Sequence, residues 1–243
     1  AVAYNLADLF EHAVDVLPDR LALICGPERR TYAELEARAN QAAHLLAAAG
    51  VAPGDMVGLY ATNSAAHVEV MLGAYKLRAV PVNVNAALGP RVEAVRHRLP
   101  GLRTTISLCG PHEGSVDHAA AVLDHSPERD FAPRSGDDLY ICYTGGTTGM
   151  PKGVVWRQED VFYALGGGYD AYTGEPVPHE RFLAERAASG EGLVLKSLTL
   201  PPLMHGAGQW GAMRFFFEGN LAVFQEHFDP RGAWELIERE RLT

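Results

Sequence analysis

The stretch "YTGGTTGMPKG", residues 143–153, has few bulky side chains and therefore adds little to a hydrophobic core. Glycine lets the backbone adopt positive φ and approach a ligand closely, so that several N–H groups can face one point. The threonine hydroxyls add hydrogen-bond donors, and Lys152 adds a full positive charge. A phosphate chain is the natural guest for such a loop. A flexible surface loop is the alternative, but such loops rarely alternate Gly and Thr and then fix a Pro-Lys-Gly.

Two common phosphate loops do not fit this stretch. The Walker loop has the pattern G-x-x-x-x-G-K-[ST], whereas two residues separate Gly149 from Lys152, and Gly153 follows the lysine. The dinucleotide fingerprint G-x-G-x-x-G fails because Gly145 and Gly146 are adjacent. The sequence therefore predicts a third kind of phosphate loop.

The composition is that of a globular protein and argues against a nucleic-acid partner. Of 243 residues, 47% are apolar and 21% are charged, and the formal net charge is −9. No cluster of Lys and Arg interrupts this acidic balance. Any bound polyphosphate must therefore be held by a local device and not by overall attraction.

The cysteines and the start of the chain indicate a reducing cytoplasm. Cys25, Cys109 and Cys142 lie beside apolar residues without a CxxC pair, which favours buried, reduced thiols and gives no support for a zinc site. The first residues lack a basic flank followed by an unbroken apolar run, so no secretory signal is expected. No window reaches the roughly 18 apolar residues of a membrane span.

Hydrophobic periodicity predicts alternating strands and helices. Ser64 can cap a helix over 65–77 between strands at 56–61 and 79–84, which is a βαβ unit and favours a parallel sheet covered by helices. Thr31 and Glu34 form a capping box for a helix that ends at about Ala49. The other expected elements are a helix at 6–17, a strand at 21–25, a turn at 26–30, a short basic helix at 91–101, a strand at 103–110, a polar linker at 126–138, a strand at 138–144, a strand and helix within 153–167, a strand within 194–200, a helix from about Gly208, a strand at 221–225 and a helix within 229–243.

The glycine-rich stretch resembles the phosphate-binding motif of the adenylate-forming superfamily, which includes acyl-CoA synthetases, firefly luciferase and the adenylation domains of peptide synthetases. The usual form is Y-T-S-G-T-T-G-x-P-K-G, and Gly145 stands here in place of the serine. The resemblance implies that Thr144, Gly145, Gly146, Thr147, Thr148 and Gly149 cradle the β- and γ-phosphates of ATP, with Lys152 as a mobile cation. Gly145 removes one hydroxyl from this cradle.

A second stretch, "PPLMHGAG" (201–208), is similar to the P-L-x-H-x-x-G segment of the same family. The resemblance implies that His205 lies near the acyl carboxylate and the α-phosphate, and that Gln209 and Trp210 begin the acyl pocket. Taken alone, a histidine before a glycine turn is more often a helix-capping or surface residue. Within the family, the chain looks most like actinobacterial acyl-CoA synthetases that act on fatty or steroid-side-chain acids.

The resemblance implies a two-step ligation. A carboxylic acid attacks ATP to give acyl-adenylate and pyrophosphate, Mg²⁺ bridges phosphate oxygens, and coenzyme A then displaces AMP. Two alternatives stay open: transfer of the acyl group to a carrier protein, and a truncated nucleotide-binding module without turnover. The sequence also leaves homo-oligomer formation open.

The resemblance implies an α/β fold that is the incomplete N-terminal part, residues 1–243, of the large adenylate-forming domain, with mostly parallel sheets flanked by helices. The later motifs of the family, a Tyr-Gly-x-Thr-Glu, a Thr-Gly-Asp and a C-terminal lysine, do not occur. The chain alone is therefore expected to be inactive. Near 85–91 the chain is shorter than the family pattern, which either a genuine deletion or a gap in the sequence explains.

Overall fold

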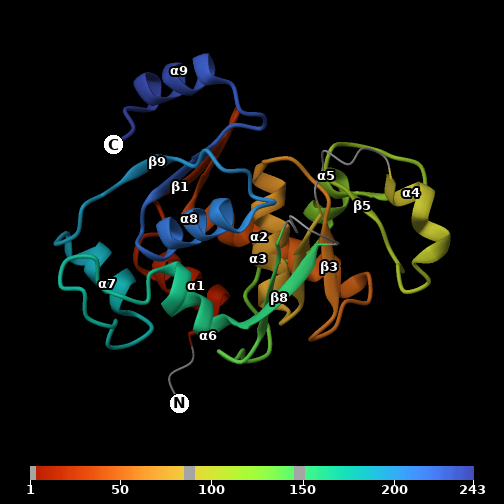
Figure 1. Ribbon diagram of the computed structural model, residues 1–243, viewed down its shortest axis with the longest axis horizontal. Helices are drawn as coiled ribbons and strands as arrows, with labels where there is room; N and C mark the ends of the chain where they lie inside the picture. Colours follow the sequence, from red (N-terminus) through yellow and green to blue (C-terminus); the bar gives the residue numbers. More distant parts are fainter. Residues whose placement is uncertain (1–3, 85–90, 145–150) are drawn as a thin grey trace.

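The computed structural model describes residues 4–84, 91–144 and 151–243. Its largest sheet has four strands in the order β2-β1-β10-β9 and joins the two ends of the chain (Figure 1). Strands β1 (Leu21–Cys25), β10 (Leu221–Phe224) and β9 (Lys196–Leu198) are parallel neighbours. Strand β10 is buried throughout and reads as a short apolar run, which is typical of a central strand in a parallel sheet.

The expected turn at 26–30 is wrong for its second half. Strand β2 (Glu28–Thr31) pairs antiparallel with β1, with Cys25 opposite Glu28. Only Gly26 and Pro27 remain for the turn, so the polar residues that follow form an edge strand. Charged side chains are typical of edge strands, which a reading of polarity alone mistakes for loop.

The first three helices begin where the sequence predicts. Helix α1 (Leu6–Val16) is capped by Asn5, α2 (Tyr32–Ala48) by the Thr31–Glu34 capping box, and α3 (Ala65–Lys76) by Ser64. Each cap accepts a hydrogen bond from an otherwise unpaired N–H of the first turn. Their apolar faces join the main core.

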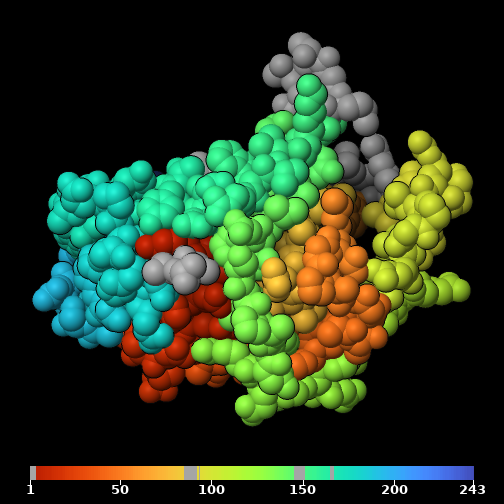
Figure 2. All heavy atoms as spheres, turned by 90° about the horizontal axis from the view of Figure 1, so that it is seen from below, coloured from red at the N-terminus to blue at the C-terminus, as the bar shows by residue number. Residues whose placement is uncertain are grey.

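The βαβ prediction is confirmed by β3 (Met56–Leu59) and β4 (Val80–Asn83), which pair in parallel on either side of α3. Four of the six strand pairs within the described residues are parallel, so the prediction of mostly parallel sheets holds. The segment that follows is less regular and forms the outer edge beside β3 (yellow in Figure 2). It contains α4 (Arg91–Val95), a 3₁₀ turn (Arg96–Arg98), β5 (Ile106–Ser107), β6 (Val116–Asp117), α5 (His118–Ala121) and a second 3₁₀ turn (Val122–Asp124).

The structure corrects the expectation that all three cysteines are buried. Cys25 is buried, but Cys142 is half-buried and Cys109 is exposed. The predicted strand at 103–110 shrinks to the two residues of β5, so Cys109 lies in the loop beyond it.

The second half of the chain contains the two strands on either side of the glycine-rich stretch and the last helices of the chain. Strands β7 (Leu139–Thr144) and β8 (Lys152–Arg157) form an antiparallel pair, followed by α6 (Gln158–Val161) and a π-helical turn (Phe162–Gly166). Helix α8 (Gly206–Phe217) begins two residues before the predicted start. Helix α9 (Pro230–Glu240) is capped by Asp229 and lies at one end of the molecule (Figure 1). Helix α7 (Phe182–Ser189) is an additional helix that the sequence analysis did not predict.

The polar linker at 126–138 contains no helix or strand, as predicted, but it is tied to the core. Figure 2 shows it running between the N-terminal helix (red) and the orange segment. It contributes two cations to a buried ion cluster whose members are Glu11, Glu36, Lys76, Arg129 and Arg134. The Lys76 ammonium lies 2.8 Å from a Glu36 carboxylate oxygen and also pairs with Glu11.

Candidate functional site

The two ends of the predicted phosphate loop face each other across a hairpin. Strands β7 and β8 stay in register up to the loop, where Thr144, the last residue of β7, lies opposite Lys152, the first residue of β8. The Thr144 hydroxyl donates to the Lys152 carbonyl oxygen over 3.4 Å. Gly145, Gly146, Thr147, Thr148 and Gly149 lie outside the described residues, so the cradle itself stays a prediction. The paired strands end at Thr144 and begin again at Lys152, on either side of the predicted cradle.

The side chain of Lys152 is available to a ligand. The residue is exposed, and within the described ranges its ammonium forms no ion pair or hydrogen bond. An unpaired cation at the mouth of a loop is the local device that a chain of net charge −9 needs to hold a polyanion.

His205 occupies the N-cap position of α8. Its backbone carbonyl accepts from the N–H groups of Gly208 and Gln209, at 3.1 and 3.2 Å, while its own N–H donates to Pro202. The imidazole makes no capping hydrogen bond and is exposed. The structure therefore fixes the backbone of His205, whose ring has no hydrogen-bond partner among the described residues, at a helix end that favours negative charge.

Gly208 holds the loop before α8 close to the helix. A Cβ built on this residue would lie 2.3 Å from the Pro202 carbonyl oxygen and 2.6 Å from that of Pro201. Such contacts are impossible without a shift of the backbone. Gly208 is therefore required by the close approach of the Pro201 and Pro202 carbonyls, because only a residue without Cβ lets this loop fold back onto the first turn of α8.

The two predicted pocket residues of α8 meet on a residue that the sequence did not single out. Tyr140, on β7, donates its hydroxyl to Gln209 Oε1 (2.7 Å) and accepts from Trp210 Nε1 (2.9 Å). Tyr140 and Gln209 are each 2% exposed. Burial, as the largest cause, raises the pKa of Tyr140 well above its ordinary value. An aromatic residue within a strand gave no signal of this role, since its partners lie 69 and 70 residues further along the chain.

The first turn of α8 also lies against β7. A Cβ built on Gly206 would lie 3.0 Å from the Cys142 sulfur, two residues before Thr144. The two motifs, 143–153 and 201–208, are therefore neighbours in space, and β7 connects them.

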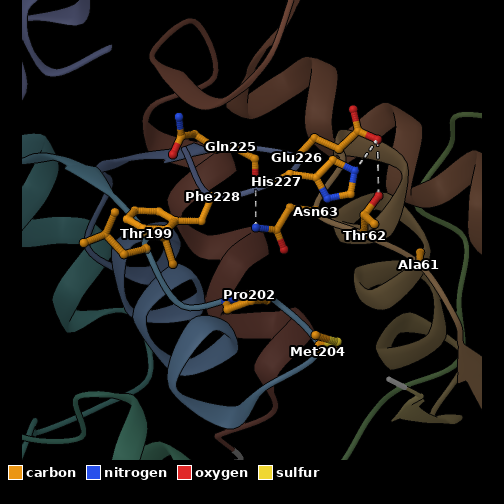
Figure 3. A pocket seen from close by; sticks show the side chains of 11 residues that line it. Ala61, Thr62, Asn63, Thr199, Pro202, Met204, Gln225, Glu226, His227 and Phe228 are labelled. Carbon is orange, nitrogen blue, oxygen red and sulfur yellow. Dashed lines mark hydrogen bonds and ion pairs between the residues drawn. The ribbon is translucent and has the colours of Figure 1, made fainter. Parts of the chain in front are cut away.

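A cavity lined by described residues lies elsewhere. It has a volume of about 260 Å³ and lies between the loops that follow β3, β9 and β10 (Figure 3). Asn63 joins these loops, because its amide accepts from the Leu203 N–H (2.8 Å) and donates to the Gln225 carbonyl (2.9 Å). Met204, next to His205, lines the cavity, but Gln209 and Trp210 do not. Gln209 and Trp210 lie instead where α8 packs against Tyr140 of β7.

Metal-binding clusters and membrane-spanning helices are both absent from the described ranges. No group of three or more His, Cys, Asp or Glu side chains there could hold a metal ion. No helix there has both the length and the apolar character that crossing a membrane requires.

Comparison with known proteins identifies the family. The AMP-binding enzyme family matches residues 10–243. The 3-oxocholest-4-en-26-oate–CoA ligase of Rhodococcus rhodochrous is 39% identical over 271 residues, which cover 100% of this chain and 48% of that ligase. The medium/long-chain-fatty-acid–CoA/3-oxocholest-4-en-26-oate–CoA ligase of Mycobacterium marinum is 41% identical and covers 100% of this chain and 50% of its own length.

A solved structure agrees. The inhibitor-bound crystal structure of the N-terminal domain of FACL13 from Mycobacterium tuberculosis matches with a TM-score of 0.75 and 25% identity, over 98% of this chain and 61% of that chain. The chain spans about half the length of the curated relatives it matches. Because the family match covers nearly all of its residues, the chain belongs to the AMP-binding enzyme family.

Proposed function

We propose that this chain supplies the ATP-phosphate loop and the start of the acid pocket of an ATP-dependent acid–CoA ligase. The observation that carries the proposal is the hairpin that sets Thr144 opposite Lys152, with the first turn of α8 packed beside it. The named relatives, which are CoA ligases, support the same reaction class.

The chemistry needs no nucleophilic side chain. The substrate carboxylate is already a nucleophile, and the barrier lies in bringing two anions together while charge develops on the departing pyrophosphate. In this proposal Thr144, Gly145, Gly146, Thr147, Thr148 and Gly149 bind the phosphates, and Lys152 offsets their charge. His205 lies by the carboxylate and the α-phosphate, and Gln209 and Trp210 contribute to the acyl pocket.

The residues fit ATP better than they fit a dedicated metal site. The free ammonium of Lys152 and the Thr144 hydroxyl suit a triphosphate. Mg²⁺ is proposed to accompany the triphosphate, as it does in many nucleotide sites. When bound, it would neutralise charge on the triphosphate. We place this chemistry in the cytoplasm.

The acid is proposed to be a fatty or steroid-side-chain acid. This assignment depends on the names of the relatives, which include a 3-oxocholest-4-en-26-oate ligase and a medium/long-chain fatty acid ligase. The whole enzyme is proposed to extend beyond this chain, and the 243 residues alone are expected to be inactive. Because the alignment with the Rhodococcus ligase runs over 271 residues, that ligase contains residues with no counterpart in this chain.

The deciding experiment measures pyrophosphate release by the full-length enzyme over short, long and steroid acids, with CoA or a phosphopantetheinylated carrier protein as acceptor. The proposal predicts release that needs both ATP and a long or steroid acid, and thioester formation with CoA. Thioester only on the carrier protein would favour the carrier-dependent alternative. ATP binding without pyrophosphate release for any acid would favour a binding module without turnover.

A further inference from the structure

We propose that Tyr140 is a positioning residue that fixes the orientation of Trp210 and thereby the shape of the acid pocket. The inference rests on the proposed function in one respect, namely that Trp210 faces the acid. Tyr140 lies on β7, the strand that leads into the phosphate loop. This strand would therefore connect the acid site to the ATP site.

The directions of the two hydrogen bonds at Tyr140 follow from the chemistry of the partners. An indole nitrogen can only donate, so the Tyr140 oxygen must accept from Trp210 Nε1 at 2.9 Å. The hydroxyl proton is then free to donate to the carbonyl-type oxygen of Gln209 at 2.7 Å. The bond to Gln209 is buried and the bond to Trp210 is partly buried, so losing the hydroxyl would leave a buried acceptor and a half-buried donor without this partner.

A second contact fixes the same indole. A Cβ built on Gly206 would lie 2.8 Å from Trp210 Cζ2 and 3.0 Å from Cη2, so the six-membered ring edge lies directly against the glycine backbone one turn earlier. The indole is thus held by a hydrogen bond to β7 and by contact with its own helix. A ring fixed at two places is a rigid wall, whereas a ring fixed at one place can change rotamer.

Tyr140 has no part in proton transfer in this account. Its hydroxyl is engaged in both directions, and burial raises the pKa of Tyr140 well above its ordinary value. Its effect on the acid pocket must pass through its two partners, Gln209 and Trp210. Three residues separate Tyr140 from Thr144 along β7, so removing the hydroxyl should disturb acid binding and leave ATP binding nearly unchanged.

The test compares Tyr140→Phe with a matched variant in the full-length enzyme. Tyr140→Phe should raise the KM for the acid by about 5- to 10-fold, the worth of one buried hydrogen bond, and change the KM for ATP by less than about 2-fold. The indole N–H resonance of Trp210, assigned by its loss in Trp210→Phe, should shift in ¹⁵N-tryptophan spectra of the ligand-free protein. Gly206→Ala, which crowds the ring from the other side, should also shift this resonance and raise the acid KM.

Tyr32→Phe is the control. Tyr32 is fully buried, and its hydroxyl donates to the Asn220 carbonyl (2.8 Å) beyond the far end of α8. This variant should lower the melting temperature but leave both the acid KM and the Trp210 resonance unchanged. An unmoved Trp210 resonance in Tyr140→Phe, or equal rises in the acid and ATP KM, would overturn the role of Tyr140. Absence of any acid-dependent turnover in the wild type would instead refute the proposed function, and the resonance would still test the positioning.

Discussion

The buried ion cluster and the β7–β8 hairpin use charge in opposite ways. In the cluster, Lys76 has a side chain that is 0% exposed and lies between the carboxylates of Glu11 and Glu36, which Arg129 and Arg134 also reach. At the hairpin, Lys152 is exposed and, within the described residues, has no anionic partner. One lysine is fully engaged by the fold, and the other is left for a ligand.

This difference separates stability from function. A buried charge whose partner is removed is strongly destabilising, because the remaining charge has lost both water and its counter-ion. An exposed charge without a partner contributes little to stability. The two lysines therefore predict opposite outcomes in the same two measurements, unfolding and turnover.

The largest expected effect on stability is that of Lys76→Met. We expect the free energy of unfolding to fall by about 3 kcal/mol, the low end for a broken buried pair, because Arg129 and Arg134 still reach the two carboxylates. Lys152→Met is the matched control and should change it by no more than about 0.5 kcal/mol. Urea denaturation of both variants measures this, and equal losses would contradict the comparison.

The next effect contrasts two glycines within α8. Gly208→Ala places its Cβ against two backbone carbonyls and should destabilise the protein by about 1–3 kcal/mol. Gly211→Ala, where no atom lies within 4 Å of the new Cβ, should stabilise it by up to about 1 kcal/mol. Thermal unfolding of the two variants should therefore move in opposite directions. A neutral Gly208→Ala would show that the Pro-Pro loop is not held against the helix.

A smaller effect concerns the stability of the protein at acid pH. Burial, with a contribution from Arg38, lowers the pKa of His118 to about 4, and its Nε2 is buried without a partner in the described structure. The unfolded state, with a pKa near 6.5, therefore binds this proton first, and stability falls as pH drops from about 6.5 toward 4, by up to about 1.4 kcal/mol per pH unit.

His118→Gln should flatten this dependence in urea titrations at several pH values. Burial also lowers the pKa of His67, so part of the slope should remain. A slope identical to that of the wild type would show that His118 does not carry it.

The sequence predicted the local elements well because their signals are local. Capping residues Thr31 and Ser64, together with apolar periodicity, place helices, and short apolar runs place β1 and β10. Edge strand β2 was misread because its exposed, charged residues resemble a turn.

The remaining features depend on contacts between distant residues. The ion cluster joins Glu11 to Arg134, 123 residues away, and nothing in the linker's composition reveals that pairing. Likewise, motif similarity indicated Gln209 and Trp210, but only the packing of α8 on β7 shows that both depend on Tyr140. Residues that touch a ligand resemble a known motif, whereas residues that hold them in place are found only in the fold.

The most direct test of the central claim is carboxylate-dependent ATP–pyrophosphate exchange by the full-length enzyme and its Lys152→Ala variant. We expect exchange that requires the acid and falls by about 10²-fold in Lys152→Ala, the typical effect of losing one charge-stabilising group. Arg157→Ala is the control, because it removes an exposed cation at the other end of β8 and should change the rate by less than about 2-fold. An unchanged rate in Lys152→Ala, or equal losses in both variants, would contradict the assignment of Lys152 to the phosphates.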